Sequence, residues 1–424
     1  MLTSSESELW HRSLCDVAHK LEIVDPGENV VIGGLPMAEE ELSEAASKTS
    51  AVLRLLSDIY IHDFDRDTKK MALALGFSEQ SAQILTMFTE DITHEVFARS
   101  DLIYSDKQWQ LVELNIGTTV GGIFYASLPR LSGQSQAYDT LKFWAKYSAE
   151  YFNFDGNIVF IEDDAHLEHM KLSLHVMVDE LKQFVPCKDI SVIGHKDVHW
   201  DGKSLYTAEG AKIDVVYRFF DERDVRDRYD EYQPVMQAIA SGAVRCPMSP
   251  KYNVLSNKGI LALLWEKALA GSLSSEDTTL VRSFIPYTFW LTSESYDAVL
   301  AQKDSLVIKP IDGNCGFDVY VGPDMSEQEW KDVVTEVMNK LHPKSYVAQR
   351  YVAPPLMNVT LAHPDGGLSN ELQKIIWGIF VFGNKNLGGF IRAKNNAGSN
   401  VINHANGANI GPLPCCQWMA HPTD

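Results

Sequence analysis

The chain has 424 residues, a formal net charge of −20 at pH 7, and 22% charged and 45% hydrophobic residues. A soluble globular protein of two or three lobes is expected from this length and composition. The negative charge argues against non-specific binding to nucleic acids or anionic membranes. No apolar stretch reaches membrane-spanning length, and the first residues do not resemble a secretory signal. We therefore expect a cytoplasmic protein with small-molecule partners, and the sequence leaves a homodimer open.

Cysteine usage favours a reducing compartment over a disulfide framework. None of the six cysteines forms a Cys-x-x-Cys pair with metal-ligand spacing. They are Cys15, Cys187, Cys246, Cys315, Cys415 and Cys416. Cys315 lies in a glycine-rich segment, where a small loop residue is a simpler interpretation than a catalytic thiol.

The N-terminal quarter is predicted to be helical. Residues 5–23, 38–61 and 67–98 carry apolar positions at helical spacing or read as helix. We expect residues 1–98 to form a helical cap, to which the sequence assigns no chemistry.

The next segment predicts a metal site on a hairpin. Residues 102–104 and 109–115 are two short strand-like runs joined by a turn. Alternation along the second run places Glu113 and Asn115 on one face, and Asp101 opens the first run. Two carboxylates and a carboxamide suit Mg²⁺ better than zinc or iron. The alternative is a polar hairpin rim with solvated acids.

Residues 99–255 are expected to join this hairpin to a substrate lobe. The glycine-rich turn after Asn115 could line a substrate pocket, and Thr118 lies in it. Downstream, strands and helices alternate, which favours a parallel sheet. Helices are expected over 134–152 and 166–184, and strands over 157–162, 190–194 and 214–219. Arg218 ends the last strand, where it could bind a substrate carboxylate or form a structural ion pair.

Residues 256–424 are expected to clamp a nucleotide. Lys258 lies in the first turn of a predicted helix, where anions are favoured, and Lys309 ends a short apolar strand. A lid follows Lys309, in which Gly313, Asn314 and Gly316 let backbone amides approach a phosphate. Helices are expected over 258–270 and 326–341, and strands near 305–310, 317–322, 345–352, 373–382 and 387–393.

Taken in order, these segments resemble the ATP-grasp superfamily, and most of all its circularly permuted branch that includes the glutathionylspermidine synthetase ligase domain. The resemblance covers roughly residues 95–400. The metal-ligand segment precedes both lysines, as in that branch, whereas ordinary ATP-grasp chains have the opposite order. The matching segments are Arg99 with Asp101, Glu113 with Asn115, Asn257 with Lys258, Lys309 with Pro310, Gly313 to Gly316, and Gln349 to Pro355.

The resemblance implies an α/β (α+β) ATP-grasp fold in circularly permuted order, with a parallel-sheet lobe and the N-terminal cap. It also implies roles for individual residues, with ATP and Mg²⁺ as cofactors. Asp101, Glu113 and Asn115 would hold magnesium, and Arg99 and Arg392 would be catalytic. The nucleotide would be bound by Lys258, Lys309, Gly313, Asn314, Gly316, Gln349, Tyr351 and Val352. Arg218 and Thr118 are the candidate substrate residues, from their own positions in the sequence rather than from the resemblance.

Three functions are compatible with these residues. The first is an ATP-dependent carboxylate–amine ligase that forms an amide or peptide bond through an acylphosphate. Its substrate would be an amino acid or small peptide. The second is a small-molecule kinase on the same fold, and the third is a noncatalytic nucleotide-binding protein. The sequence does not identify the carboxylate or the amine.

Overall fold

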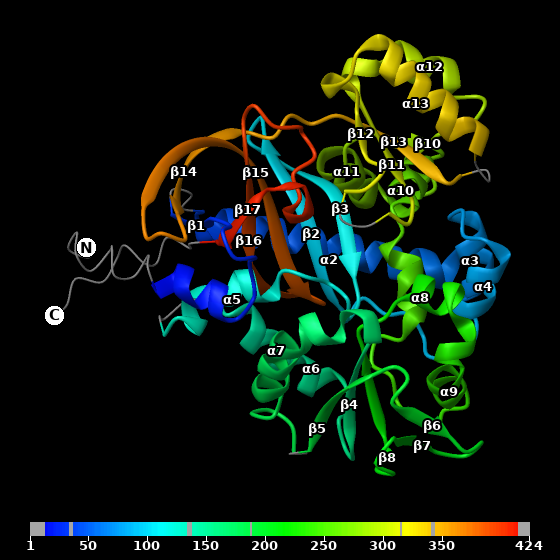
Figure 1. Ribbon diagram of the computed structural model, residues 1–424. Helices are drawn as coiled ribbons and strands as arrows, with labels where there is room; N and C mark the ends of the chain where they lie inside the picture. Colours follow the sequence, from blue (N-terminus) through cyan, green and yellow to red (C-terminus); the bar gives the residue numbers. More distant parts are fainter. Residues whose placement is uncertain are drawn as a thin grey trace.

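The protein is described by a computed structural model over residues 13–33, 37–133, 138–186, 189–313, 316–340 and 344–413. A seven-stranded sheet in the order β14-β1-β17-β16-β15-β2-β3 lies at its centre (Figure 1). Its strands are β1 (Val30–Gly33), β2 (Phe97–Ser105), β3 (Gln108–Ile116), β14 (Leu356–Ala362), β15 (Leu368–Phe382), β16 (Lys385–Asn395) and β17 (Asn409–Pro412). Because β14 also pairs with β15, five strands close into a ring, and β2 and β3 extend the sheet beyond it.

Helix α2 (Glu39–His62) packs against β15 and β16 and supplies much of the core. Its apolar residues recur at helical spacing, so one stripe is buried against the sheet. The C-terminal half of β15 is buried on both faces. A strand covered on both sides is expected to read as a continuous apolar run, as residues 375–382 do apart from Gly378.

The prediction of an all-helical N-terminal region is wrong at two places. Strand β1 lies inside the central sheet, between β14 and β17. Residues 67–98 form two short helices, α3 (Thr68–Ala74) and α4 (Glu79–Leu85), followed by a loop and the start of β2. Gly76 separates the helices at a φ of +86°, and a Cβ there would lie 2.4 Å from the carbonyl oxygen of Lys344. A glycine turn that contacts another segment this closely ends the helix.

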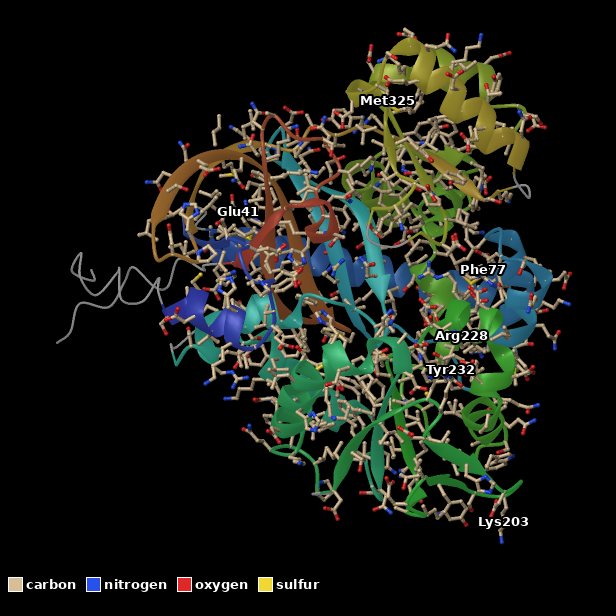
Figure 2. The ribbon with its side chains drawn as sticks, viewed as in Figure 1. Glu41, Phe77, Lys203, Arg228, Tyr232 and Met325 are labelled. Carbon is tan, nitrogen blue, oxygen red and sulfur yellow. The ribbon has the colours of Figure 1, made fainter. Side chains whose placement is uncertain are left out.

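The predicted parallel sheet is present as a separate lobe. Its order is β5-β4-β9, and both pairings are parallel. The lobe contains β4 (Ile158–Glu162), β5 (Ile190–Gly194), β9 (Val215–Arg218), α6 (Thr140–Tyr151), α7 (Asp164–Leu181), α8 (Glu222–Asp227) and α9 (Tyr229–Ala240). A small antiparallel sheet is attached to it, formed by β6 (Val198–Trp200), β7 (Leu205–Thr207) and β8 (Lys212–Ile213). Arg228 and Tyr232 mark the α8–α9 side of this lobe in Figure 2.

A second small lobe carries the predicted nucleotide-binding segments. Its sheet has the order β10-β13-β11-β12. Its elements are α10 (Gly259–Leu269), α11 (Ser275–Phe284), β10 (Thr288–Trp290), α12 (Tyr296–Ala301), β11 (Leu306–Pro310), β12 (Tyr320–Val321), α13 (Glu327–Lys340) and β13 (Tyr346–Arg350). Helices α12 and α13 cover one face of this sheet, and a separate hydrophobic cluster around Trp330 and Ile308 holds them there (Figure 1). Among the residues described, no helix is both long and apolar enough to cross a bilayer.

Candidate active site

Four polar side chains lie on one face of the β2–β3 hairpin. Arg99 pairs with Asn115, and Asp101 pairs with Glu113. Residues opposite each other on antiparallel strands share a face, as do residues two apart on one strand. The hairpin therefore brings the three predicted metal ligands together, with Arg99 beside them. Their roles remain predictions.

The same hairpin contains an irregularity that the sequence did not indicate. The register shifts after Asp101, so that Leu102 pairs with Leu111 and Val112 has no partner on β2. Such a bulge turns the backbone groups of the extra residue away from the ladder. The Val112 carbonyl instead accepts a hydrogen bond of 2.9 Å from Lys309 Nζ. The bulge thus connects the hairpin to the small lobe.

Asp101 lies between two arginines. Arg99 donates Nε to Asp101 Oδ1 at 2.8 Å and Nη2 to Oδ2 at 3.1 Å, and Arg392 Nη2 lies 2.7 Å from Oδ1. Burial alone would raise the pKa of Asp101, but Arg392 and Arg99 outweigh it and hold that pKa below its usual range. The carboxylate is therefore charged and orients both guanidinium groups.

The ring of Phe390 supports the same two arginines. The Cζ atoms of Arg99 and Arg392 each lie 5.6 Å from the centre of this ring. Phe390 pairs with Gly378 on β15, and Gly378 pairs with Asp101 on β2. The missing side chain at Gly378 makes room for the ring, because a Cβ there would lie 2.4 Å from Phe390 Cε1.

Replacing Gly378 by alanine is expected to displace Phe390 and, with it, both arginines. The ring cannot simply retreat, because it also packs on Gly122, where a Cβ would lie 2.5 Å away. Overpacking of this kind costs about 1–3 kcal/mol. Urea unfolding should show this loss of stability. A separate activity assay should show reduced ADP release. Gly33→Ala is the control, since nothing lies within 4 Å of its Cβ position, and a second change of Phe390→Leu should recover part of the stability.

Lys258 closes the other side of the hairpin. Its Nζ lies 3.0 Å from Glu113 Oε1 and donates to the carbonyl of Gly313. Its backbone N–H donates to the Ile311 carbonyl at 2.8 Å. The start of α10, the β2–β3 hairpin and the glycine-rich segment after β11 therefore meet at this one ammonium group.

Lys309 lies inside the small-lobe sheet. Besides Val112, its Nζ donates to Gln349 Oε1 at 2.7 Å, and Gln349 Nε2 donates to Thr288 Oγ1 at 3.0 Å. Burial lowers the pKa of Lys309 to about 8, an effect that Glu113 and Asp101 partly oppose and Lys258 reinforces. The Lys309 side chain is therefore neutral in part of the molecules at mildly alkaline pH.

Nucleotide binding is accordingly expected to be coupled to proton uptake at alkaline pH. In the free protein the pKa of Lys309 is lowered from 10.5 to about 8, so above pH 8 most of this ammonium has lost its proton. A polyphosphate beside it favours the charged form and restores the proton. Calorimetry of ATP binding at pH 8.5, in buffers of different ionisation enthalpy, should reveal uptake of about three-quarters of a proton. Lys309→Met should abolish the buffer dependence; a wild-type enthalpy equal in all buffers would contradict this assignment.

Two cavities meet at these charged groups. The larger, about 520 Å³, reaches from the hairpin to the start of α8, and the smaller, about 100 Å³, lies between the hairpin and the small-lobe sheet. The residues that line both are Asp101, Glu113, Lys258, Arg392 and Asn403. The smaller cavity is also lined by Lys309, Gly316, Gln349, Tyr351 and Val352 together with aliphatic side chains. Gly313 lines the larger one.

The two predicted substrate residues are not at the cavity, which corrects the expectation for both. Arg218 is fully buried, and its guanidinium donates to the carbonyls of residues 248, 220 and 249 at 2.9, 2.6 and 3.0 Å. It holds two chain segments together and has no free edge for a carboxylate. Thr118 is also buried, and its neighbour Thr119 lines the larger cavity instead. Asn314 and Cys315 lie outside the described residues.

The far wall of the larger cavity is acidic. It is formed by the start of α8 and by the segment after β11, through Asp221, Glu222, Asp224 and Asp312, and it includes one cation, Arg223, which pairs with Asp221 at 3.2 Å. Glu222 is 2% exposed, and its Oε1 has no hydrogen-bond partner among the described residues. Burial raises the pKa of Glu222, an effect partly offset by Ser81. The cavity therefore has a cationic end and an acidic end.

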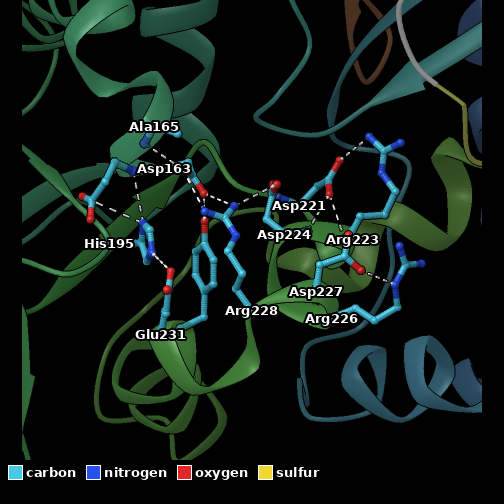
Figure 3. Close-up of polar contacts among 12 residues, drawn as sticks. Asp163, Ala165, His195, Asp221, Arg223, Asp224, Arg226, Asp227, Arg228 and Glu231 are labelled. Carbon is cyan, nitrogen blue, oxygen red and sulfur yellow. Dashed lines mark hydrogen bonds and ion pairs between the residues drawn. The ribbon is translucent and has the colours of Figure 1, made fainter. Parts of the chain in front are cut away.

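A network of polar contacts holds this acidic wall in place (Figure 3). Arg228 pairs with Asp163 at the end of β4 and lies 3.6 Å from Asp224. Tyr232 donates to the same Asp163, and His195 stacks on Tyr232 at a centroid distance of 4.1 Å. The carboxyl ends of β4 and β5 are thus fastened to α8 and α9.

Comparison with known proteins identifies this arrangement. A family model for circularly permuted ATP-grasp type 2 proteins matches residues 164–374. The chain is a circularly permuted ATP-grasp protein. The predicted fold is thereby confirmed. The matched segment contains Lys258, Lys309 and Gln349, whereas Asp101 and Arg392 lie outside it.

One curated relative and one solved structure agree with this circularly permuted ATP-grasp assignment. The ATP-grasp enzyme ankG of Aspergillus thermomutatus is 24% identical over 177 residues, which are 38% of this chain and 36% of that protein. The match thus spans about a third of the relative's length. The apo structure of a glutathione synthetase-like effector, GSS30, from Globodera pallida is similar over 98% of both chains, with 11% identity and a TM-score of 0.62. A putative gamma-glutamylcysteine synthetase from Methylobacillus flagellatus KT aligns over 90% of each chain, with 11% identity and a TM-score of 0.46.

Proposed function

We propose that this ATP-grasp protein is an ATP-dependent carboxylate–amine ligase that joins an amino acid or small peptide to an amine through an acylphosphate. The observation that carries the proposal is the junction of the two cavities. One end of that junction can hold a nucleotide base, and the other opens to a space large enough for two small substrates. Cations and carboxylates lie between them, where a triphosphate would be positioned.

The smaller cavity suits adenine. Away from the junction its walls are aliphatic, from Val307 and Ile376 among others, and residues 349–352 line it at the end of β13. This stretch of chain would meet the edge of the base. The Lys309 ammonium is held between the base end and the junction. A nucleotide in this position would direct its phosphates toward Lys258 and Arg392.

The donor set at the junction fits Mg²⁺. Asp101, Glu113 and Asn115 supply hard oxygen atoms from one face of one hairpin. Glu113 pairs with a single cation among the described residues, so most of its lone pairs remain for a metal, whereas Asp101 is shared by two arginines. Mg²⁺ held by these residues would supply positive charge that stabilises the negative charge developing on the phosphate.

The chemistry assigned to the chain is mainly electrostatic. The substrate carboxylate oxygen bonds to the terminal phosphorus of ATP as the bond to ADP breaks, which gives an acylphosphate. Arg99, Arg392 and Lys258 would stabilise the charge on the transferring group. An amine then bonds to the acyl carbon, and the bond to phosphate breaks. The acidic wall around Glu222 would attract the amine substrate in its ammonium form into the cavity, and its nitrogen reacts at the junction.

A trapping experiment tests this function. ADP release from MgATP should be measured with a pool of amino acids, with and without hydroxylamine, and the products weighed by mass spectrometry. A ligase gives a hydroxamate of the carboxylate substrate, and amide products without the trap. ADP release with a stable phosphorylated product would indicate a kinase. Thermal stabilisation by ATP without any ADP release would indicate a noncatalytic nucleotide-binding protein.

A further inference from the structure

His404 lines the larger cavity, is paired with a glutamate, and has no role in the chemistry described so far. His404 begins the short helix η4 (His404–Asn406), and its Nε2 lies 2.8 Å from Glu28 Oε2. The two residues are 376 positions apart in the chain. The parallel pairing of β1 with β17 brings them together, because Glu28 directly precedes β1 and η4 directly precedes β17.

The pair lies close to the arginines of the junction. His404 shares the cavity wall with Tyr125, Phe390 and Arg392. The ring centres of Tyr125 and His404 are 6.0 Å apart, and those of Tyr125 and Phe390 are 5.3 Å apart. Since Phe390 supports both Arg99 and Arg392, one aromatic ring separates His404 from the side chain on which these arginines rest.

The geometry of the pair is that of an oriented base. A carboxylate on Nε2 favours the tautomer that carries its proton there, and this leaves Nδ1 as the nitrogen that accepts a proton. The side chains of His404 and Glu28 are 29% and 34% exposed, so a substrate in the cavity can reach the imidazole. The pair differs in this from His195, which is fully buried in the network below the cavity.

Two side chains from other elements face His404. Glu28, from the segment before β1, places its carboxylate on the Nε2 side of the ring. Tyr125, from α5 (Ile123–Leu131), faces the ring from the other side, and burial together with Glu28 raises the pKa of Tyr125 to about 12. Tyr125 therefore stays neutral and does not compete for the proton, while Arg392 and Arg99 are paired with Asp101.

We propose that His404, oriented by Glu28, accepts the proton that the attacking amine must lose in the second half of the reaction. This inference rests on the proposed ligase function. The amine nitrogen bonds to the acyl carbon, the bond from that carbon to the phosphate oxygen breaks with its electron pair, and phosphate leaves. The nitrogen then carries one proton too many, and this proton moves to His404 Nδ1. Glu28 is the positioning residue that stabilises the imidazolium.

The test compares two nucleophiles with the same acylphosphate. Hydroxylamine is largely unprotonated at neutral pH, so it depends little on a base, whereas an amino acid's amine is largely protonated there. With MgATP and the amino-acid pool, His404→Gln should reduce amide formation about 100-fold relative to hydroxamate formation. The loss should shrink as pH rises and free amine becomes abundant. Glu28→Gln should give a smaller loss of amide relative to hydroxamate, because the imidazole is no longer oriented by its partner.

His199→Gln is the matched control, because His199 lies exposed on β6, away from both cavities, and should leave both products unchanged. Equal losses of amide and hydroxamate in His404→Gln, or no loss of either, would overturn the base assignment. So would a ratio of amide to hydroxamate in Glu28→Gln equal to that of wild type, which remains informative if the His404 variant fails to fold. Wild-type protein that forms no hydroxamate would instead overturn the ligase function, and this inference with it.

Discussion

Glu113→Gln is expected to reduce ADP release about a thousandfold while the protein remains folded. Glutamine keeps the shape of the side chain, which is 29% exposed, but it removes the carboxylate with the most lone pairs available to a cation. It also removes the counter-charge of Lys258. The Lys258 ammonium can then pair with a phosphate of ATP even when no metal is bound. Steady-state ADP release over a range of Mg²⁺ concentrations measures the effect.

The control for this change is the replacement of a paired carboxylate that lines neither cavity. Glu180 is 5% exposed and pairs with Arg130 at 2.9 Å, outside both cavities. Glu180→Gln should affect stability but not the Mg²⁺ dependence of turnover. Near-normal turnover of Glu113→Gln at every Mg²⁺ concentration would contradict the metal assignment.

Lys309→Met is expected to weaken ATP binding by about 2 kcal/mol, close to a 30-fold change in Kd. Methionine preserves the aliphatic stem in the small-lobe sheet but removes the only ammonium that contacts both Val112 and Gln349 among the residues described. The loss combines a missing contact to phosphate with a Gln349 side chain that is no longer held in place. Calorimetric titration with a non-hydrolysable ATP analogue measures it directly.

Lys303→Met is a closely matched control. Lys303 is a buried lysine of the same lobe, and its Nζ donates to the carbonyls of Gly322 and Met325 at 3.1 and 2.9 Å. It lines neither cavity. If the lobe tolerates loss of a buried ammonium, this variant should bind the analogue normally. Unchanged affinity in Lys309→Met would contradict a phosphate-binding role.

The sequence anticipated the parts of the site that follow local rules. Alternation along β3 predicted that Glu113 and Asn115 share a face, and chain order predicted the permuted fold. The four arginine and lysine side chains that surround the junction were all named from the sequence. Their convergence depends on pairings between distant strands, which no local pattern specifies.

The features that the sequence did not predict depend on contacts between segments that are far apart in the chain. Ligands bind at the carboxyl ends of parallel strands, and this rule favoured Arg218 as a substrate-binding residue. Its guanidinium instead donates hydrogen bonds to the backbone carbonyls of residues 248 and 249. The bulge at Val112 appears only once β2 is paired with β3. Strand β1 is only four residues long and lies between predicted helices, so its pairing with β17, which places Glu28 beside His404, carried no sequence signal.

Gly378 and Phe390 show a weaker signal that was overlooked. A glycine inside a long apolar run marks a bulge or a close approach of another group. Gly378 interrupts such a run in β15, and the group that approaches it is the Phe390 ring. Interpreting that glycine as a contact point would have suggested that an aromatic side chain packs there and supports Arg99 and Arg392.

The most direct test of the account is a crystal structure of the protein with a non-hydrolysable ATP analogue and Mn²⁺. The base should occupy the smaller cavity beside Gln349 and Tyr351, and the phosphates should lie between Lys258 and Arg392. The anomalous signal of Mn²⁺ should fall within coordination distance of Glu113. A nucleotide bound elsewhere, or a metal with no oxygen ligand from the β2–β3 hairpin, would contradict it.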